Sequence, residues 1–275
     1  MPVYNGGDTI GAALSSLVFQ SYEDLEIIVA DNHSTDNTSE VCDAIRKTDP
    51  RVKVFRHEEN LGAANNFEFV LRQARGEFFM FAGDDDVWER DFVAANVANL
   101  VGDPALIASV SRVRYTRGNQ EAKLAPWSPS GTSPLLGSVS QNLWRYVANP
   151  GLNSRFYSVF RRDVLVNCLP LPRFPAWDWA FIVKTLRWGK YAEVPQVLLT
   201  RSLHGDSSDA CRTLGGQSTF FKRVFPMWAF SSFVLDQPHV PKSGPVLGAL
   251  CSANLIGFAA LMRARVMRLC RGQAR

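Results

Sequence analysis

Three consecutive carboxylates, Asp84, Asp85 and Asp86, follow an apolar run at residues 78–82 after a single glycine, Gly83. Like charges this close repel one another, so a bound cation would lower the cost of keeping them ionised. Carboxylate oxygens with an open coordination sphere suit Mg²⁺ or Mn²⁺, and such an ion would hold a diphosphate. The plainer alternative is a turn and a helix start, where aspartate is also favoured. A further carboxylate, Asp31, ends another apolar run and favours ligand binding.

The segments around these carboxylates alternate between strand and helix patterns. Apolar runs at 25–30, 52–55 and 78–82 are typical of buried strands, and helical periodicity separates them. This alternation predicts right-handed βαβ units and an α/β fold with a mostly parallel sheet. Ligands bind such sheets outside the carboxyl ends of the strands, which is where Asn5, Asp31 and the Asp84–Asp86 run fall. The sequence therefore predicts an acidic cleft.

The second half of the chain is less regular. Residues 116–138 are rich in Ser, Pro, Gly and Thr, which predicts a long loop. The patterns that follow predict a helix at 139–148, strands near 155–160 and 192–200, and a helix that begins near Trp177. Residues 216–235 and 245–270 are also helical in pattern. An Asn60 N-cap is expected for the helix that runs through Val70.

Composition excludes several classes of protein. Hydrophobic residues make up 46% and charged residues 20% of the chain, as in globular proteins. The five cysteines contain no C-x-x-C pair, which argues against a disulfide framework and a zinc cluster. The sequence holds neither G-x-G-x-x-G after a strand nor G-x-x-x-x-G-K-[ST], so a nicotinamide site and a P-loop are both disfavoured. Without a glycine-rich phosphate cradle, the metal would have to neutralise the phosphates.

Positive charge is concentrated at the C-terminal end. The net charge is +4, yet residues after Asp236 carry six basic and no acidic side chains. Residues 1–236 carry 24 basic and 26 acidic side chains, and this slightly acidic body argues against a nucleic-acid partner. Residues 243–262 are uncharged and precede five arginines, so this tail could pack on the protein, lie on a membrane surface or span the membrane. No signal peptide is evident, and we expect a cytoplasmic protein, with the tail as a possible contact to the inner face of the membrane.

Several motifs occur in an order that is typical of one enzyme family. They are Pro2-Val3-Tyr4-Asn5-Gly6, Ser21-Tyr22 with the run from Glu26 through Asp31 to Thr38, Asn60-Leu61-Gly62, Ala74-Arg75-Gly76-Glu77, Asp84-Asp85-Asp86-Val87-Trp88, Trp177-Asp178-Trp179, and Arg201-Ser202-Leu203-His204-Gly205-Asp206-Ser207. The chain resembles family 2 glycosyltransferases of the GT-A fold over residues 1–100 and, less closely, 150–208. Asn66-Phe67-Glu68 resembles the members that build bacterial surface polysaccharides, including those that transfer rhamnose.

The resemblance implies a role for each matching residue. Asp178 matches the general base of inverting members, Asp85 matches the metal-binding carboxylate, and His204 resembles a residue near the metal and diphosphate. The positions that match the family's nucleotide-sugar contacts are Pro2, Val3, Tyr4, Asn5, Asp31, Asn32, Ser34, Asn66 and Asp84. Plainer alternatives are a helix N-cap for Asp178 and a structural loop histidine for His204.

The activity implied is inverting, metal-dependent transfer of a hexose or deoxyhexose from a nucleotide-diphosphate sugar to a saccharide or lipid-linked acceptor. The implied layout is a glycosyltransferase domain at 1–210, with a nucleotide-sugar half at 1–100 and an acceptor half at 101–210, and a helical extension at 211–275. One departure is Gly83, where many relatives have Asp. It supports the alternative of a weak or inactive sugar-nucleotide-binding scaffold; a sugar nucleotidyltransferase is the third option.

The first strand is short. Parallel strands usually run about five or six residues before their ligand-binding end, and here only four residues precede Asn5. Relatives of the family carry an apolar run before this motif, which favours a shortened N-terminus over a true start with a short strand. A short strand is expected to leave backbone groups near Ile27–Val29 unpaired and their apolar side chains exposed.

Overall fold

The computed structural model describes residues 1–118, 120–122, 131–174, 176–203, 227–240 and 244–252. The chain divides into two compact units, each made of several segments. The first comprises Met1–Leu136, Gly151–Leu171 and Trp188–Leu203, and the second comprises Gly137–Pro150, Pro172–Arg187 and His204–Arg275. The domain boundary predicted near residue 210 lies outside the described residues.

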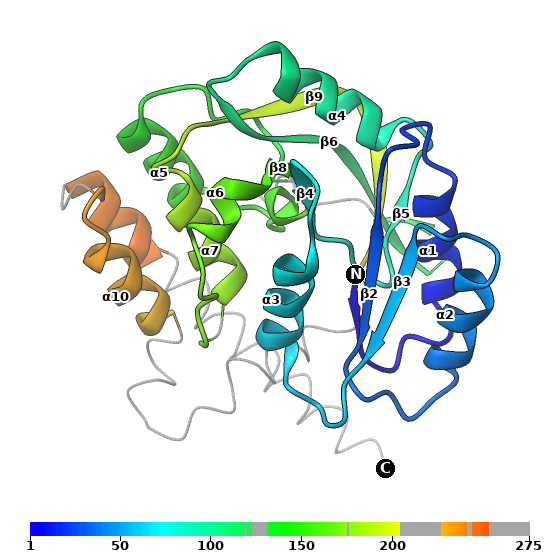
Figure 1. Cartoon of the computed structure of the whole chain (residues 1–275). Helices are drawn as coiled ribbons and strands as arrows, with labels where there is room; N and C mark the ends of the chain where they lie inside the picture. The colour runs from blue at the N-terminus through cyan, green and yellow to red at the C-terminus, as the bar shows by residue number, and fades with distance from the viewer. Residues whose placement is uncertain (119, 123–130, 175, 204–226, 241–243, 253–275) are drawn as a thin grey trace. The chain divides into compact units, whose positions relative to one another are not determined.

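The first unit begins with a parallel sheet of three strands in the order β1-β2-β3 (Figure 1). β1 is Pro2–Val3, β2 is Ile27–Asp31 and β3 is Val52–Arg56. All five β2 side chains are buried, as expected of a parallel strand covered on both faces. Val3 pairs with Asp31, and Asp31 pairs with Arg56, so the carboxyl ends of the three strands lie together.

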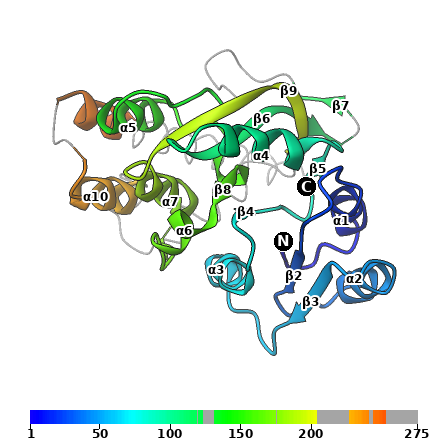
Figure 2. The ribbon, with the colours of Figure 1, turned by 45° about the horizontal axis from the view of Figure 1, so that its top comes forward.

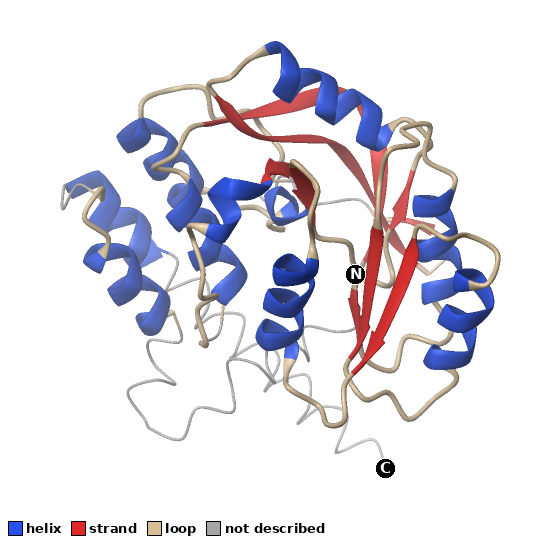
Figure 3. Ribbon diagram, viewed as in Figure 1, coloured by secondary structure: helices blue, strands red, loops and turns tan. Residues whose placement is uncertain are grey.

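Helices cover both faces of this sheet. α1 (Ile10–Val18) and α2 (Thr38–Arg46) lie on one side and α3 (Ala63–Gln73) lies on the other (Figure 3). α1 buries Ile10, Ala13, Leu14 and Leu17, the spacing of an amphipathic helix whose apolar stripe faces the core. The short-strand expectation is wrong on one point, because Ile27, Ile28 and Val29 are all buried.

The N-cap expected at Asn60 is wrong. α3 begins at Ala63 after Gly62, whose φ is 79°. Asn60 Oδ1 instead accepts hydrogen bonds from the Gly62 N–H (2.9 Å) and from Asn32 Nδ2 (2.8 Å). Its side chain therefore closes the turn that precedes the helix, which is a competing use for asparagine.

A second, six-stranded sheet completes the first unit. Its main path runs β4-β8-β6-β9-β5, and β7 pairs with β6. The strands are β4 (Phe78–Met80), β5 (Val87–Trp88), β6 (Leu106–Arg117), β7 (Gln120–Glu121), β8 (Val159–Arg161) and β9 (Lys190–Ser202). α4 (Phe92–Gly102) packs along β6 and β9 (Figure 2), and the 3₁₀ helix Ser154–Tyr157 and α6 (Arg162–Val166) flank β8.

The sequence patterns did not predict β6. This strand has 12 residues, and its second half carries three arginines. It runs past the expected start of the loop at 116, and β7 follows at Gln120–Glu121. Residues 119 and 123–130 of that loop are not described. Leu135 then makes a bridge with Tyr191 on β9, which ties the end of the loop to the sheet.

The second unit is helical in its described parts. α5 (Val139–Ala148) forms where predicted and starts with a capping box between Ser138 and Gln141. α7 (Trp177–Thr185) and α10 (Trp228–Asp236) lie side by side (Figures 1 and 2). The Trp179 ring meets the edge of Phe230, with ring centroids 6.0 Å apart. Trp179 thus contributes to packing within the second unit.

The C-terminal tail is described only in part. Residues 244–252 are helical, while the arginine-rich residues 253–275 lie outside the described residues. Within the described parts of the chain, no helix combines the length and apolar character needed to cross a membrane.

Candidate functional site

The turns after β1 and β2 are joined through Asn5. The Asn5 N–H donates to Ser34 Oγ (2.9 Å), and Asn5 Oδ1 accepts from the Thr35 N–H (2.8 Å). Asn5 has a φ of 54°, in the left-handed region where asparagine is one of the better-tolerated residues. Tyr4 and Asn5 are exposed, whereas Pro2 and Val3 are buried in the core. Of these four predicted nucleotide contacts, Tyr4 and Asn5 therefore present their side chains at the surface.

Asp84 lies against the backbone that follows β1. The Gly6 N–H donates to Thr38 Oγ1 (2.9 Å), which fixes this segment against α2. A Cβ built on Gly6 would lie only 2.2 Å from Asp84 Oδ2. Only a glycine therefore permits this approach, and it brings the segment after β4 to the carboxyl end of the first sheet.

Asp31 is completely buried at the end of β2. Its Oδ1 accepts from the Ser34 N–H (2.8 Å), and its Oδ2 accepts from Arg56 Nη1 (3.0 Å) and from the Ser39 hydroxyl. Burial alone would raise the pKa of this carboxyl. The hydrogen bonds from Ser34 and Ser39 and the charge of Arg56 outweigh burial and lower the pKa below its ordinary value. Asp31 is thus held as a carboxylate.

Asn32 and Asn66 hold the segment between β3 and α3. Asn32 Oδ1 accepts from the Leu61 N–H (2.8 Å), and Asn66 Nδ2 donates to the Ala30 carbonyl (2.8 Å). Asn66 Oδ1 lies 3.0 Å from His57 Nε2 and accepts a hydrogen bond from the ring N–H, which sets the imidazole orientation. Both side chains are buried. Their amides shape the edge of the site, and their predicted contacts with the nucleotide stay predictions.

The three consecutive aspartates occupy different environments. Asp84 and Asp85 are half-buried, but Asp86 is buried. Asp86 Oδ2 accepts from Arg201 Nε and Asp86 Oδ1 accepts from the Ser202 N–H, both at 3.3 Å. The pKa of Asp86 is raised to about 6. Burial is the main cause, and the negative charge of Asp85 raises the pKa further, while the positive charge of Arg201 lowers it. Asp86 therefore anchors the aspartate segment to the end of β9.

Arg201 is itself fixed on several sides. Its Nη1 donates to the Leu152 carbonyl (3.0 Å) and to Ser154 Oγ (3.2 Å). Its guanidinium lies over the Tyr157 ring, 4.3 Å from the centroid, in a cation–π arrangement. These contacts connect the Asp86 anchor to the 3₁₀ helix before β8.

Gly83 directly precedes the aspartate segment. A Cβ here would lie 3.0 Å from Asp86 Oδ2 and 3.1 Å from Asp85 Oδ1. A side chain at this position would displace one of the two carboxylates, so Gly83 fits the local arrangement of this chain.

The predicted metal ligands are Asp85 and His204. Asp85 lies in the half-buried part of the aspartate segment, and His204 lies outside the described residues. In the ranges that the structure describes, no group of three or more His, Cys, Asp or Glu residues is arranged to hold a metal ion. Asp84 and Asp85 still offer carboxylate oxygens, and Mg²⁺ is commonly held by one or two carboxylates together with substrate phosphates.

Asp178 lies in the first turn of α7, in the second unit. The N-cap of this helix is Ala176, so the alternative that Asp178 serves as the N-cap is wrong. A carboxylate in the first turn is nevertheless favoured by the helix dipole. Its side chain is half-buried.

Sequence reasoning missed the residues that hold the aspartates. Arg56 and Ser39 contact Asp31, and Arg201 contacts Asp86. Arg56 and Arg201 lie at the ends of β3 and β9, and Ser39 lies in the first turn of α2. An ion pair between neighbouring strand ends was a usable signal for Arg56, because β3 was predicted correctly.

Solved structures of GT-A glycosyltransferases share this fold. Staphylococcus aureus TarS residues 1–349, solved in complex with UDP-GlcNAc, superposes with a TM-score of 0.64 at 18% identity, covering 86% of this chain and 66% of that one. Mannosyltransferase PcManGT from Pyrobaculum calidifontis, solved with GDP-Man and Mn²⁺, gives a TM-score of 0.62 at 18% identity, covering 98% and 73%. The predicted α/β fold of the GT-A type is confirmed.

Curated relatives are bacterial glycosyltransferases. The chain is 38% identical over 88 residues to the Escherichia coli enzyme WfgD, covering 32% of this chain and 34% of that protein. It is 27% identical over 214 residues to an uncharacterised glycosyltransferase of Haemophilus influenzae, covering 75% and 65%. It is 33% identical over 93 residues to GlyG of Streptococcus pneumoniae, covering 34% and 31%. The chain thus matches between about a third and two thirds of the length of these relatives.

The family assignment rests on a longer match. The sequence profile of glycosyl transferase family 2 matches residues 1–168, which include the three-stranded sheet, the aspartate segment and β6. The resemblance drawn from the motifs is confirmed, and the chain belongs to glycosyl transferase family 2.

Proposed function

We propose that this protein is an inverting, metal-dependent glycosyltransferase that moves a sugar from a nucleotide-diphosphate donor to a saccharide or lipid-linked acceptor. The observation that carries the proposal is the approach of Asp84 to Gly6, because it puts the aspartate segment beside the carboxyl end of the parallel sheet. Ligands of open α/β sheets bind at that end. The site is acidic, as a cation-assisted diphosphate site requires.

The donor's nucleotide is assigned to the ends of β1 and β2. Tyr4 is exposed there and offers a ring for stacking on a base. Asp31 is the proposed acceptor for a base N–H; its carboxyl is completely buried and already accepts from Ser34, Ser39 and Arg56, so a base would have to reach it through this network. Ser39 and Arg56 keep Asp31 ionised and oriented. TarS and PcManGT, which share the fold, were solved with UDP-GlcNAc and GDP-Man.

A divalent cation suits the donor set of Asp84 and Asp85. When bound, it would share the charge that develops on the leaving diphosphate. Asp85 is the proposed ligand and Asp84 the neighbour of the ribose or donor sugar, while Asp86 is already engaged by Arg201 and Ser202. PcManGT was solved with Mn²⁺. His204 remains the second proposed ligand.

Asp178 is the proposed general base. A carboxylate within hydrogen-bond reach of the acceptor hydroxyl removes its proton as the oxygen attacks the anomeric carbon. Attack on the face opposite the departing diphosphate inverts that carbon. WfgD and a Campylobacter jejuni relative act, by their names, on sugars linked to diphosphoundecaprenol or PP-undecaprenol, which supports a lipid-linked acceptor.

A screen of nucleotide sugars tests this function. The full chain is heated with UDP-, GDP- and dTDP-sugars, each with Mn²⁺ and with EDTA. A ligand that binds the folded state raises the melting temperature. At a ligand concentration of a hundred times the Kd, the folded state is stabilised by about 2.7 kcal/mol. We expect a rise with one nucleotide class and only with Mn²⁺, followed by slow hydrolysis of that donor. Binding without hydrolysis or transfer to any acceptor would instead favour the scaffold alternative.

The basic tail is the proposed membrane contact. Five arginines follow an uncharged run in this tail. Each would contribute about 1 kcal/mol to binding through attraction to anionic lipid headgroups. Full-length protein should sediment with vesicles that contain phosphatidylglycerol and not with pure phosphatidylcholine. Equal recovery in the supernatant with both vesicle types would contradict this role.

A further inference from the structure

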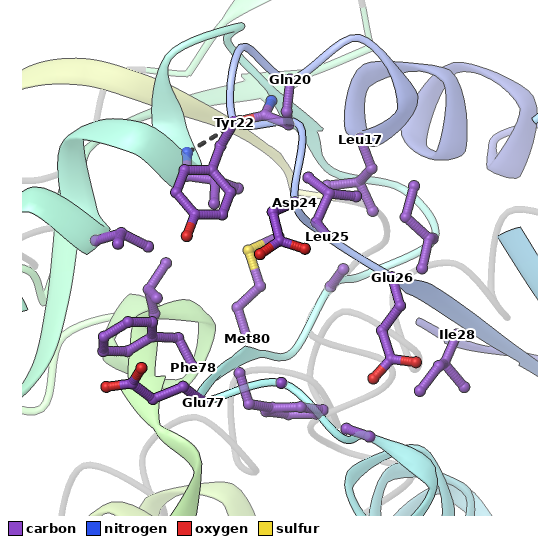
Figure 4. Close-up of a pocket in the computed structure, with 18 of the residues that line it drawn as sticks. Leu17, Gln20, Tyr22, Asp24, Leu25, Glu26, Ile28, Glu77, Phe78 and Met80 are labelled. Carbon is purple, nitrogen blue, oxygen red and sulfur yellow. Dashed lines mark hydrogen bonds between the residues drawn. The ribbon is translucent and has the colours of Figure 1, made fainter. Parts of the chain in front are cut away.

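Outside the candidate site, titratable side chains lie against buried surface in the cleft drawn in Figure 4 and around His239. The cleft has a volume of about 520 Å³, and Asp24, Glu26 and Glu77 are among the residues that line it. Burial raises the pKa of Glu26, but hydrogen bonds from Lys53 and from a backbone N–H outweigh burial and lower it. Glu26 therefore keeps its charge at neutral pH. A histidine, in contrast, can change its charge in that range.

A β-turn after α10 presents His239. The turn runs from Gln237 to Val240, and the Val240 N–H donates to the Gln237 carbonyl at 3.1 Å. Pro238 occupies the second position of the turn, where its fixed φ is favourable. Val240 is buried, and the Gln237 side chain donates to the Phe233 carbonyl at 3.2 Å. Both ends of the turn are thus anchored, and His239 is held in its third position.

The imidazole of His239 contacts the C-terminal turn of α7. Its Nε2 lies 3.1 Å from the carbonyl oxygen of Val183, which is one of the last four carbonyls of that helix. These carbonyls lack partners within an α-helix and need donors from elsewhere. Because a carbonyl oxygen only accepts, Nε2 carries the proton of the neutral ring and donates to Val183.

The other ring nitrogen makes protonation unfavourable. Nδ1 is buried and has no hydrogen-bond partner among the residues that the structure describes. In the neutral ring it bears only a lone pair, whereas in the charged ring it would be a buried N–H without an acceptor. Burial accordingly lowers the pKa of His239; the hydrogen bond to Val183 opposes this, and the charge of Arg187 lowers the pKa further.

The charged groups on the neighbouring elements do not reverse this preference. In the described residues, α7 carries Lys184 near its end and Asp178 at its opposite end, and Arg187 follows the helix. α10 ends at Asp236, which is exposed to solvent. The unfolded chain takes up a proton at the ordinary pKa of 6.5, so the folded state loses stability as the pH falls below that value.

His239 is one of several contacts that fix α7. Near the start of the helix, the Trp179 ring packs on Phe230 of α10, and the Tyr146 hydroxyl donates to the Trp179 carbonyl at 3.4 Å. Near its end, His239 supplies the bond to Val183. The helix has only nine residues, so a tilt at its last turn also moves its first turn, where Asp178 lies.

We propose that His239 is a pH-sensitive positioning residue: its neutral imidazole ties the turn after α10 to the end of α7 and so keeps Asp178 in place, and protonation releases the turn. Acid then slows the reaction through α7, in addition to any effect on the aspartate segment. The link to Asp178 rests on the proposed function, whereas the contact between His239 and Val183 does not.

Two substitutions separate donation by the ring from its titration. His239→Gln keeps an N–H within reach of the Val183 carbonyl and cannot be protonated near neutral pH, whereas His239→Leu has no donor. Gln237→Leu is the matched control, because it removes a hydrogen bond from the same turn to α10 instead of α7. At pH 7.5 we expect the amides of α7 to exchange at least about fivefold faster in His239→Leu and within about twofold of the unmodified rate in the other two variants.

Exchange at pH 5 tests the release. The unmodified protein should lose protection in α7 toward the level of His239→Leu, while His239→Gln keeps it. The Met1 amino group titrates in both proteins, so its effect cancels in the comparison. The ¹⁵N shifts of the His239 ring should show the Nε2–H tautomer and a pKa below 6.5. Equal loss of protection in the unmodified protein and His239→Gln would overturn the proposal, as would the Nδ1–H tautomer.

Turnover tests the link to Asp178. Between pH 7.5 and pH 5, kcat should fall at least about threefold more in the unmodified protein than in His239→Gln. The donor Kd should be the same for both, because the ends of β1 and β2 belong to the first unit. Coinciding kcat profiles would overturn the positioning of Asp178. Absence of turnover with every donor would instead refute the proposed function, and the exchange data would then decide the contact between His239 and Val183 alone.

Discussion

Arg201 Nε donates to Asp86 Oδ2 at 3.3 Å, with the Asp86 side chain 2% and the Arg201 side chain 16% exposed. This ion pair connects the end of β9 to the segment that carries Asp84 and Asp85. Neither residue of the pair needs to touch a substrate for the pair to matter. Its role is to hold two half-buried carboxylates in place against their mutual repulsion.

Replacing Arg201 by methionine should destabilise the fold. The change leaves the buried Asp86 without its counter-charge, a loss of about 3–5 kcal/mol for pairs of this kind. Asp86→Asn in the same background should recover part of the loss, because it removes the uncompensated charge. Urea unfolding of the single and double variants measures the free energies of unfolding.

Arg46→Met is the control. It removes a half-exposed pair with Asp43 and should change the free energy of unfolding by less than about 1 kcal/mol. Additive effects of Arg201→Met and Asp86→Asn would contradict the coupling.

Asp85→Asn should abolish metal-dependent donor binding without unfolding the protein, because Asp85 is half-buried at a strand end rather than in the core. Isothermal titration with Mn²⁺ and the donor found by the screen measures the effect. Glu89→Gln, an exposed carboxylate four residues along the chain, is the matched control and should bind as the unmodified protein does. Undiminished Mn²⁺ dependence in Asp85→Asn would remove Asp85 from the site.

Asp178→Asn should separate binding from turnover. Loss of a general base lowers turnover by about 10²–10⁴-fold and leaves donor affinity nearly unchanged. Initial rates and donor Kd are measured side by side. Asp236→Asn changes an exposed carboxylate at the end of α10 in the same unit and should affect neither. Parallel losses of donor affinity and rate would assign Asp178 a structural role.

The stability of the protein should rise with pH between 5 and 8 because of Met1. Its amino group has a pKa of about 5 when folded and 8.0 ordinarily, so in this range the unfolded chain binds more protons. The free energy of unfolding therefore rises as pH increases, by up to about 4 kcal/mol at 1.36 kcal/mol per pKa unit. Unfolding is measured at pH 5, 6.5 and 8 for the free and the Nα-acetylated protein. The difference between their pH profiles isolates Met1; identical profiles would show that this amine does not titrate as described.

The sequence patterns predicted the strands β2 and β3 and their ends, because the apolar residues of these strands and the helical stripe of α1 are local patterns. They also placed β4 in the parallel sheet, and this was wrong, because β4 pairs antiparallel with β8 in the second sheet. The same patterns gave no sign of β6, whose second half mixes Arg112, Arg114 and Arg117 with apolar residues. Its long pairing with β9 explains why it forms: the residues that pair with it lie 83 or more positions away in the sequence and decide the structure of this segment. Local patterns carry no record of such pairing.

The site shows the same division. Asp31 and the Asp84–Asp86 run could be found from their types and positions after apolar runs. What distinguishes Asp86 from Asp84 is the position of Arg201, which is 115 residues away. Likewise, the expected cap at Asn60 failed because Asn32 competes for its side chain. Tertiary contacts, not composition, assigned these polar groups their roles.

Gly6→Ala should disturb the contact between β1 and Asp84. The new Cβ would lie 2.2 Å from Asp84 Oδ2 and 2.8 Å from Val3 Cγ2, so either Asp84 must move or β1 must shift. We expect a loss of about 1–3 kcal/mol, as for overpacked positions, together with at least tenfold weaker donor binding. Gly102→Ala is the control, since nothing lies within 4 Å of its Cβ and alanine extends the end of α4. It should be neutral or stabilising by up to about 1 kcal/mol. If Gly6→Ala bound donor normally, the approach of Asp84 to the end of β1 would have no part in donor binding.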